Sequence, residues 1–494
     1  MTISFDSVPT NVRVPFMYAE FNNANAVQGP DQQPYKVLLM GQKLADGTAT
    51  ALVPVRITSA QQAQTLFGEG SHLHGMALAH FANNTMTETW VIPVADASGT
   101  NATGSIAITG PATASGTLAL YIAGRRLAIG ITAADTATEI GDAIEAAIND
   151  ATGADALPVT ASNTTGTVTI TARHDGTIGN EIDIRHSHLS DESLPAGVGV
   201  TITAMASGAT DPTLTSAIAA MGDEWYNCVA FGWTNSAALT AIKAEMADRF
   251  GPLRMIDGRF FVSKNDTHGN LGTFGDAHNS QHMVVMHSRL SPMPAYEWAA
   301  ALCAVDAYYA PIDQARPLQT LEIKAPTGVY IAPKKSDLFT FEENNLLLYD
   351  GIGTFYVDAD GSVRIQRVVT TYKTNALGAP DTSYLDIETL QTLSYLRYDF
   401  RNFFTRKYPR HKLADDGTRY GRGQAVMTPK LAKAEAINRF RQWEELGLVE
   451  NIDQFKEDII VERNATDRNR LDFMLPPDLV NQLRVVGVQI GFIL

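Results

Sequence analysis

Hydrophobic and polar positions divide the chain into stretches with different periods. Residues 35–96 and 211–355 alternate short apolar runs with helical patterns; examples of the runs are YKVLLMG from Tyr35 and HMVVMH at 282–287. Strands that are apolar throughout and alternate with helices are typical of a mostly parallel sheet with helices on both faces. The two stretches together predict one discontinuous α/β domain. They also predict a helix around residues 274–281, and mixed loops with short strands after Pro311.

Residues 97–210 interrupt this pattern and are rich in Thr, Ala, Gly and Ser. Five short β-patterns (GTLALYIAG, RLAIGI, GTVTITAR, NEIDIRHS and VGVTITAM) accompany one helical pattern, TATEIGDAIEAAIND. A β-rich segment whose ends fall inside an α/β pattern indicates an inserted α+β domain, which is tolerated because domain ends usually lie close together. We expect this domain on the outside of any assembly, where it does not disturb core packing.

The region 356–482 predicts a C-terminal α+β domain. A turn sequence at Asp358 to Gly361 precedes the β-branched run from Val363, so a hairpin is expected. One helix follows and ends before Pro409, and a second runs from Thr428 to Gly447. The apolar positions are Leu390, Leu393, Leu396, Phe400, Phe403 and Phe404 in the first helix, and Leu431, Ala434, Ile437, Phe440, Trp443 and Leu446 in the second.

Both ends of the chain are apolar. Residues 1–34 predict an extended arm and linker, and residues 483–494 predict a strand-like tail. An isolated strand exposes unpaired backbone groups, so each end either adds to a sheet of a neighbouring subunit or pairs within its own subunit. The residues alone leave both possibilities open. The candidate strand-exchange residues are Ile3, Phe5, Val12, Val14, Phe16, Val485, Val488, Ile490, Phe492 and Leu494.

Charge and length narrow the class of protein. A chain of 494 residues suggests about three domains, and its net charge of −15 argues against a nucleic-acid partner. Residues 1–360 carry twice as many acidic as basic side chains, whereas residues 361–494 have a small basic excess. We find no signal-peptide pattern and no run approaching about 18 apolar residues, so we expect a cytosolic product without membrane insertion. The face of the first C-terminal helix opposite its apolar positions carries Arg397, Arg401, Arg406 and Lys407.

None of the chemistry-bearing residues forms a recognisable site pattern. His278 and His282 have the four-residue spacing of a zinc pair, but Asn279 stands where a hydrolytic zinc site needs Glu. Cys228 and Cys303 lie in apolar runs, which is typical of buried free thiols. The sequence contains neither a G-x-S-x-G elbow nor a phosphate loop. We therefore expect no enzyme activity, no metal and no cofactor, although a Ser, a His and an Asp could still meet from distant positions.

Long strings of the C-terminal region carry a specific resemblance. RVVTTYKTNALGAPDTSYLDIETLQTLSYLR, YPRHKLADDGTRYG, VMTPKLAKAEAINRFRQWEELGLVEN and VERNATDRNRLDFMLPPDLVNQLRV resemble tail sheath proteins of contractile bacteriophages, specifically the Mu-like group. The opening MTISFDSVPTNVRVPFMYAEF resembles the N-terminus of the same family. The resemblance implies a structural protein that polymerises helically around a tail tube and contracts to drive the tube through the host envelope during genome ejection. It also implies a subtilisin-like α/β domain, and a shared fold does not import a catalytic triad.

The resemblance further implies partners and a location. Subunits would be linked by exchanged terminal strands into stacked hexameric rings, and would contact the tail tube, baseplate and tail terminator proteins. The protein would belong to the virion tail and assemble in the host cell cytoplasm. The four basic helix residues become candidates for contact with an acidic tube. Two other classes stay open: a hydrolase built on the α/β domain, and a receptor-binding or decorating virion protein, which the Thr-rich insertion favours.

Overall fold

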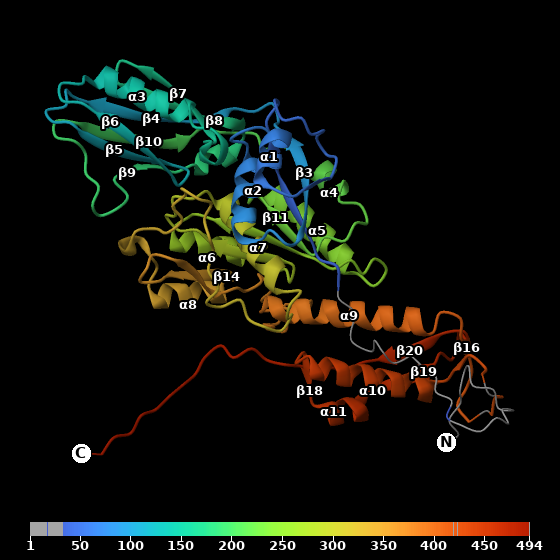
Figure 1. The fold of residues 1–494 in the computed structure, drawn as a ribbon. Helices are drawn as coiled ribbons and strands as arrows, with labels where there is room; N and C mark the ends of the chain where they lie inside the picture. The colour runs from blue at the N-terminus through green and yellow to red at the C-terminus, as the bar shows by residue number, and fades with distance from the viewer. Residues whose placement is uncertain (1–16, 18–32, 418, 422, 494) are drawn as a thin grey trace. The chain divides into compact units, whose positions relative to one another are not determined.

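The computed structural model describes residue 17 and residues 33–417, 419–421 and 423–493. The chain forms two compact units. The first, called the body below, comprises residues 34–395 together with 481–493; the second, called the C-terminal unit, comprises residues 396–480. Figure 1 shows the elements of both units in chain order by colour.

The body is built on an eight-stranded sheet with the order β15-β14-β13-β12-β11-β1-β3-β2. Six strands run parallel, and β2 and β15 pair antiparallel at the two edges. The predicted mixed α/β class with a mostly parallel main sheet is confirmed. The strands are β1 (Lys36–Lys43), β2 (Val55–Ile57), β3 (Glu88–Ala95), β11 (Cys228–Phe231), β12 (Arg259–Lys264), β13 (Met283–His287), β14 (Ile352–Val357) and β15 (Val363–Arg367).

Helices connect these strands and begin at caps that the sequence supplies. The side chains of Ser59, Ser71 and Asn235 each accept a hydrogen bond from a backbone N–H three residues further on, which satisfies a donor that the helix leaves unpaired. The helices are α1 (Ala60–Phe67), α2 (His72–Asn83), α4 (Thr215–Ala219), α5 (Ser236–Phe250), α6 (His268–Asp276), α7 (Ala295–Tyr309) and α8 (Phe341–Tyr349).

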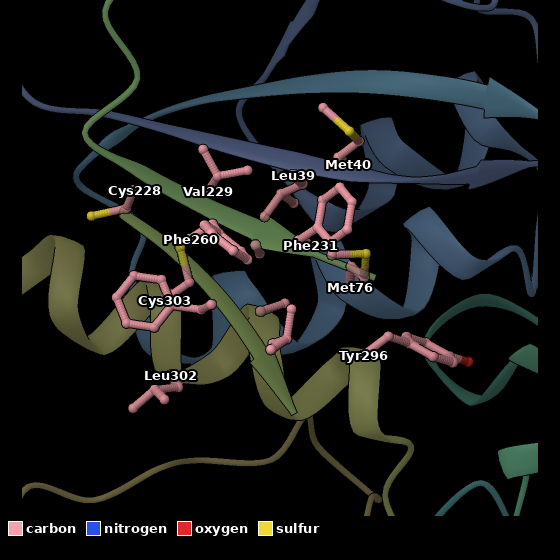
Figure 2. Close-up of a cluster of buried hydrophobic side chains, with 14 of the residues drawn as sticks. Leu39, Met40, Met76, Cys228, Val229, Phe231, Phe260, Tyr296, Leu302 and Cys303 are labelled. Atoms are coloured by element: carbon pink, nitrogen blue, oxygen red, sulfur yellow. The ribbon is translucent and has the colours of Figure 1, made fainter. Parts of the chain in front are cut away.

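The core of the body lies where α2 and α7 contact the central strands. Leu39 of β1 lies there with Met76 of α2 and Leu302 of α7, whereas Phe231 of β11 and Phe260 of β12 point to the opposite face of the sheet and extend the core there (Figure 2). All five side chains are buried, and burying each one contributes about 1.5–3 kcal/mol. The continuous apolar strands therefore stabilise the sheet through the helices that cover it.

Two helices of the body differ from the sequence expectation. A helix was expected around residues 274–281, but α6 begins earlier because the Thr267 side chain accepts from the Asn270 N–H. Helix α8 occupies a region where loops and short strands were expected. Thr340 and Glu343 cap each other's backbone N–H there, and this capping box starts a helix through the apolar run that follows.

Residues 97–210 form two antiparallel sheets, β10-β4-β8-β7 and β6-β5-β9, around a hydrophobic core of their own. Strands β4 and β7 were missed at the sequence level, because small and polar residues hide their alternation. The predicted helix α3 (Ala137–Asn149) starts at a capping box. The strands are β4 (Asn101–Thr109), β5 (Gly116–Ile122), β6 (Arg125–Ile131), β7 (Val159–Thr164), β8 (Thr167–Asp175), β9 (Ile184–His186) and β10 (Gly199–Ala206).

A two-strand neck joins this insertion to the rest of the body. Thr100 N donates to Ala209 O and Ala209 N donates to Thr100 O, each at 3.1 Å. A buried ion pair adds a second attachment, since Arg125 Nη1 lies 3.2 Å from Glu297 Oε1 of α7. The two ends of the insertion are therefore neighbours, as expected for an inserted segment.

Helix α9 (Ile387–Lys407) starts directly after Asp386 and ends before Pro409, as predicted. Helix α10 (Pro429–Glu445) is also confirmed, with Thr428 as its cap and proline in its first turn. From residue 396 onward α9 belongs to the C-terminal unit. The other elements of that unit are β16 (Lys412–Leu413), β17 (Val426–Met427), β18 (Val449–Glu450), α11 (Ile452–Asp458), β19 (Ile460–Arg463), β20 (Leu471–Met474) and β21 (Asp478–Leu479).

Candidate functional site

The C-terminal tail is held to the body up to Arg484. Arg484 Nη2 donates to Glu388 Oε2 at 2.8 Å and to Asp386 Oδ1 at 2.9 Å. Gln319 Nε2 donates to Leu483 O at 3.0 Å. Glu388 is buried in the first turn of α9; burial raises its pKa to about 7, although the Arg484 guanidinium acts in the opposite direction. The sequence analysis did not predict this cluster. Its one indication in the sequence is that Arg484 is a charged residue next to an apolar tail.

Beyond Arg484 the tail has no secondary structure through residue 493. Its six apolar side chains are each at least 70% exposed. A strand was expected here, but a strand needs a partner, and the structure assigns no strand pair to residues 485–493. The exposed side chains are Val485, Val486, Val488, Ile490, Phe492 and Ile493. Of the candidate exchange residues, Leu494 and the five of the N-terminal arm lie outside the described residues.

The four basic candidates occupy the second half of α9. Arg397 and Arg401 are half-buried, whereas Arg406 and Lys407 are exposed. Lys407 Nζ lies 2.7 Å from Glu435 Oε2 of α10 and 5.0 Å from the centre of the Phe403 ring. Part of the basic face therefore has partners within its own unit.

The core of the C-terminal unit forms where α9 and α10 pack together. Asp399 of α9 is fully buried; it pairs with Arg439 of α10 and accepts from Trp443 Nε1 at 2.6 Å. Phe440 stacks on Phe455 of α11 with 4.1 Å between ring centres. Of the predicted apolar stripe of α10, only Phe440 and Trp443 are buried. The buried face runs instead through Ala432 and Ala436, and the stripe positions left exposed are Leu431, Ala434 and Leu446.

A small sheet of the C-terminal unit consists, in the described part of the chain, of the two strands β19 and β20. β19 and β20 pair antiparallel, and within the described part of the chain neither strand has a second neighbour. Ile460 and Met474, which face each other in register, are about half exposed. Leu471 and Phe473 of β20 also line an open groove of about 460 Å³, together with Phe404. A strand that joins β20 could place alternate apolar side chains against this groove.

The two histidines and two cysteines considered in the sequence analysis are buried side chains. His278 contacts Lys243 Nζ at 3.2 Å, and burial, with Lys243 adding to it, lowers its pKa to about 4. His282 Nδ1 lies 3.0 Å from Gly258 O. Cys228 and Cys303 are buried free thiols, as predicted. Among the described residues, we find no group of three His, Cys, Asp or Glu side chains placed to hold a metal ion, and no helix long and apolar enough to cross a membrane.

Comparisons with known proteins agree with these features. The family model of the phage tail sheath protein central domain matches residues 207–371, and that of the phage tail sheath C-terminal domain matches residues 379–493. The chain is 42% identical over 495 residues to the Mu-like prophage FluMu tail sheath protein of Haemophilus influenzae, covering 100% of both chains.

Solved structures of two sheath tail proteins are also similar to this chain. The protein from Desulfitobacterium hafniense matches 94% of this chain and 100% of its own, with 11% identity and a TM-score of 0.48. The protein from Listeria innocua matches 92% of this chain and 94% of its own, with 12% identity and a TM-score of 0.49.

The chain belongs to the phage tail sheath protein family, in its Mu-like group. It is a structural subunit of a contractile tail sheath, a component of the virion tail that assembles with copies of itself into a helical polymer, and it is not an enzyme. Neither the hydrolase nor the receptor-binding alternative is supported.

Proposed function

We propose that this chain polymerises helically around a tail tube by strand exchange and contracts to drive the tube through the host envelope during genome ejection. The observation that carries the proposal is the tail at residues 485–493, which exposes six apolar side chains and has no strand partner among the described residues of its own subunit. An extended apolar segment of this kind fits β-augmentation, in which backbone hydrogen bonds give affinity and alternate side chains give specificity.

The acceptor we propose is the β19–β20 sheet of a neighbouring subunit. A two-stranded sheet is marginal alone and gains stability from further strands. The groove beside β20, which Leu471 and Phe473 line, offers apolar surface to Val488, Ile490 and Phe492. Because donor and acceptor are unlike surfaces, the contact is head to tail and propagates as a helix.

The N-terminal arm has the same proposed role. Its apolar residues Ile3, Phe5, Val12, Val14 and Phe16 are proposed to add to a neighbouring sheet as the tail does. We further propose that the α/β domain is subtilisin-like and that the chain is divided into domains at 1–34, 35–96 with 211–355, 97–210, 356–482 and 483–494.

Contraction is proposed to release a kinetically trapped lattice. Stacked hexameric rings assemble around the tube in the host cell cytoplasm, between the baseplate and the tail terminator. A trigger at the baseplate lets each subunit rotate and move outward while the exchanged strands keep neighbours joined. New contacts between the α/β domains bury further surface and supply the free energy.

The basic residues of α9 are proposed to face the tube. We propose that these residues form weak ion pairs with the tube, of under about 1 kcal/mol each at the exposed positions, because such contacts must break during contraction. The four residues are Arg397, Arg401, Arg406 and Lys407. Reversing two charges (Arg401→Glu with Lys407→Glu) is expected to weaken co-sedimentation of the sheath with purified tubes. The control is Lys456→Glu, which reverses the charge of a basic residue on α11, outside the set proposed to face the tube. Unchanged co-sedimentation of the double variant would show that these residues do not face the tube.

Deleting residues 485–494 tests the strand exchange. We expect the truncated chain to form no tubes in negative-stain microscopy, because the donor strand is gone. The monomer should keep its thermal unfolding midpoint, since the removed side chains of residues 485–493 are exposed and make no strand pairs.

A pair of point variants refines this test. Val488→Lys with Ile490→Lys places charge on the alternate positions proposed to face the groove and should also prevent tubes. Gln489→Lys places charge on the opposite side of the same strand and should be tolerated. Normal tubes from the truncated chain would refute the exchange.

A further inference from the structure

The tail changes character sharply at one residue. Up to Arg484 it makes specific contacts with the body, and from Val485 onward every described residue is exposed. The Arg484 side chain is only 13% exposed. Residues 482–484, called the root of the tail below, directly precede the exposed segment. Burying a charged side chain such as that of Arg484 costs desolvation free energy unless the charge is paired, so its burial here needs a physical reason.

Four charges balance each other at this root. Asp386 receives both Arg484 and a two-pronged contact from Arg367, whose Nη2 lies 3.0 Å from each carboxylate oxygen. Glu388 receives Arg484 on one oxygen and the backbone N–H of Leu318 on the other. Two guanidinium groups thus face two carboxylates at the start of α9, where the helix dipole also favours negative charge.

The backbone of the root is held as well. Gln319 uses its amide nitrogen on Leu483 O and its amide oxygen on Arg484 Nη1, at 3.0 and 3.4 Å. Gln482 Nε2 donates to Ala315 O at 3.3 Å. Residues 482–484 are therefore fixed on both backbone and side chain, and the exposed segment starts from a defined point.

We infer that Arg484 is a positioning residue for assembly: its pairing with Asp386 and Glu388 fixes the point at which the exchanged tail leaves the body. The inference rests on the proposed strand exchange and adds a named anchor to it. A tail that starts from a fixed point samples fewer conformations and reaches its acceptor at a higher effective concentration. The same anchor holds the tail to the body when subunits move during contraction.

A purely structural role predicts different behaviour. If Arg484 serves only to neutralise the buried Glu388, removing both charges should restore both the stability of the monomer and the assembly of tubes. Replacing a buried ion pair by neutral groups is often nearly neutral for stability, whereas removing one partner is costly. The double variant Arg484→Gln with Glu388→Gln therefore separates stability from positioning.

The experiment compares three full-length chains (the parent, Arg484→Gln and the double variant) with a fourth chain from which residues 485–494 are deleted. Thermal unfolding reports stability, and the critical concentration for tube formation in light scattering and negative stain reports assembly. We expect the double variant to have the same unfolding midpoint as the parent but a critical concentration for tube formation about tenfold higher. The conformational entropy regained when one ordered residue becomes free corresponds to about a tenfold change in an equilibrium constant.

Each outcome has one meaning. A double variant that folds and assembles like the parent overturns the anchor, while tubes lost only on deletion leave the strand exchange standing. Tubes formed normally by the deletion chain overturn the strand exchange and the anchor together. If the double variant itself unfolds early, Arg484→Lys replaces it in the same comparison; this variant keeps the charge but loses the forked geometry, and unchanged assembly would overturn the anchor.

Discussion

Replacing Asp306 with alanine is expected to lower the free energy of unfolding of the body by about 3–5 kcal/mol. Asp306 is fully buried on α7, where Arg259 Nε donates to its Oδ2 at 2.8 Å and Gln391 Nε2 donates to its Oδ1 at 2.6 Å. Burial raises the pKa of Cys228, so its thiol stays protonated and donates to the same carboxylate. Removing the carboxylate leaves a buried guanidinium without its counter-charge.

Hydrogen exchange of α7 and β12 peptides in the full chain measures this effect. Asp358→Ala is the control, because the Asp358–Arg364 pair is partly exposed and should contribute under about 1 kcal/mol. Equal protection in the two variants would contradict a structural role for the buried pair.

Phe440→Ala should destabilise the C-terminal unit by about 3–5 kcal/mol. Phe440 is fully buried and stacks on Phe455, so truncation leaves a cavity between α10 and α11. Leu446→Ala lies on the same predicted stripe, but Leu446 is 47% exposed and should lose much less. Hydrogen exchange of α10 peptides distinguishes the two variants, and similar losses would show that the whole stripe is buried.

Elements with a local signal could be predicted from the sequence. Thr428 followed by proline marked the start of α10, and the continuous apolar runs marked β1 and β13. Helix α8 had an equally local signal in Thr340 and Glu343, but the apolar run after it favoured strands. The capping box predicts this helix better than the apolar pattern does, because so short a helix has too few buried positions to show a helical period.

Features that depend on distant residues could not be predicted. The root of the tail joins Arg484 to Asp386 and Glu388, which lie almost a hundred positions earlier in the chain. The stripe on α10 gave six apolar positions, yet the packing of α9 and α11 decided that Phe440 is buried and Leu431 is exposed. Periodicity identifies a face, whereas burial depends on the neighbours that cover it.

The neck formed by Thr100 and Ala209 makes the insertion exchangeable. Its two ends are one hydrogen-bonded pair apart, so a foreign domain with equally close termini can be grafted there without stretching β3 or the segment before β11. The graft removes Arg125 and leaves Glu297 buried without its counter-charge, so it should carry Glu297→Gln. Every copy in the tail would then display the cargo, which turns the polymer into a dense, regularly spaced scaffold.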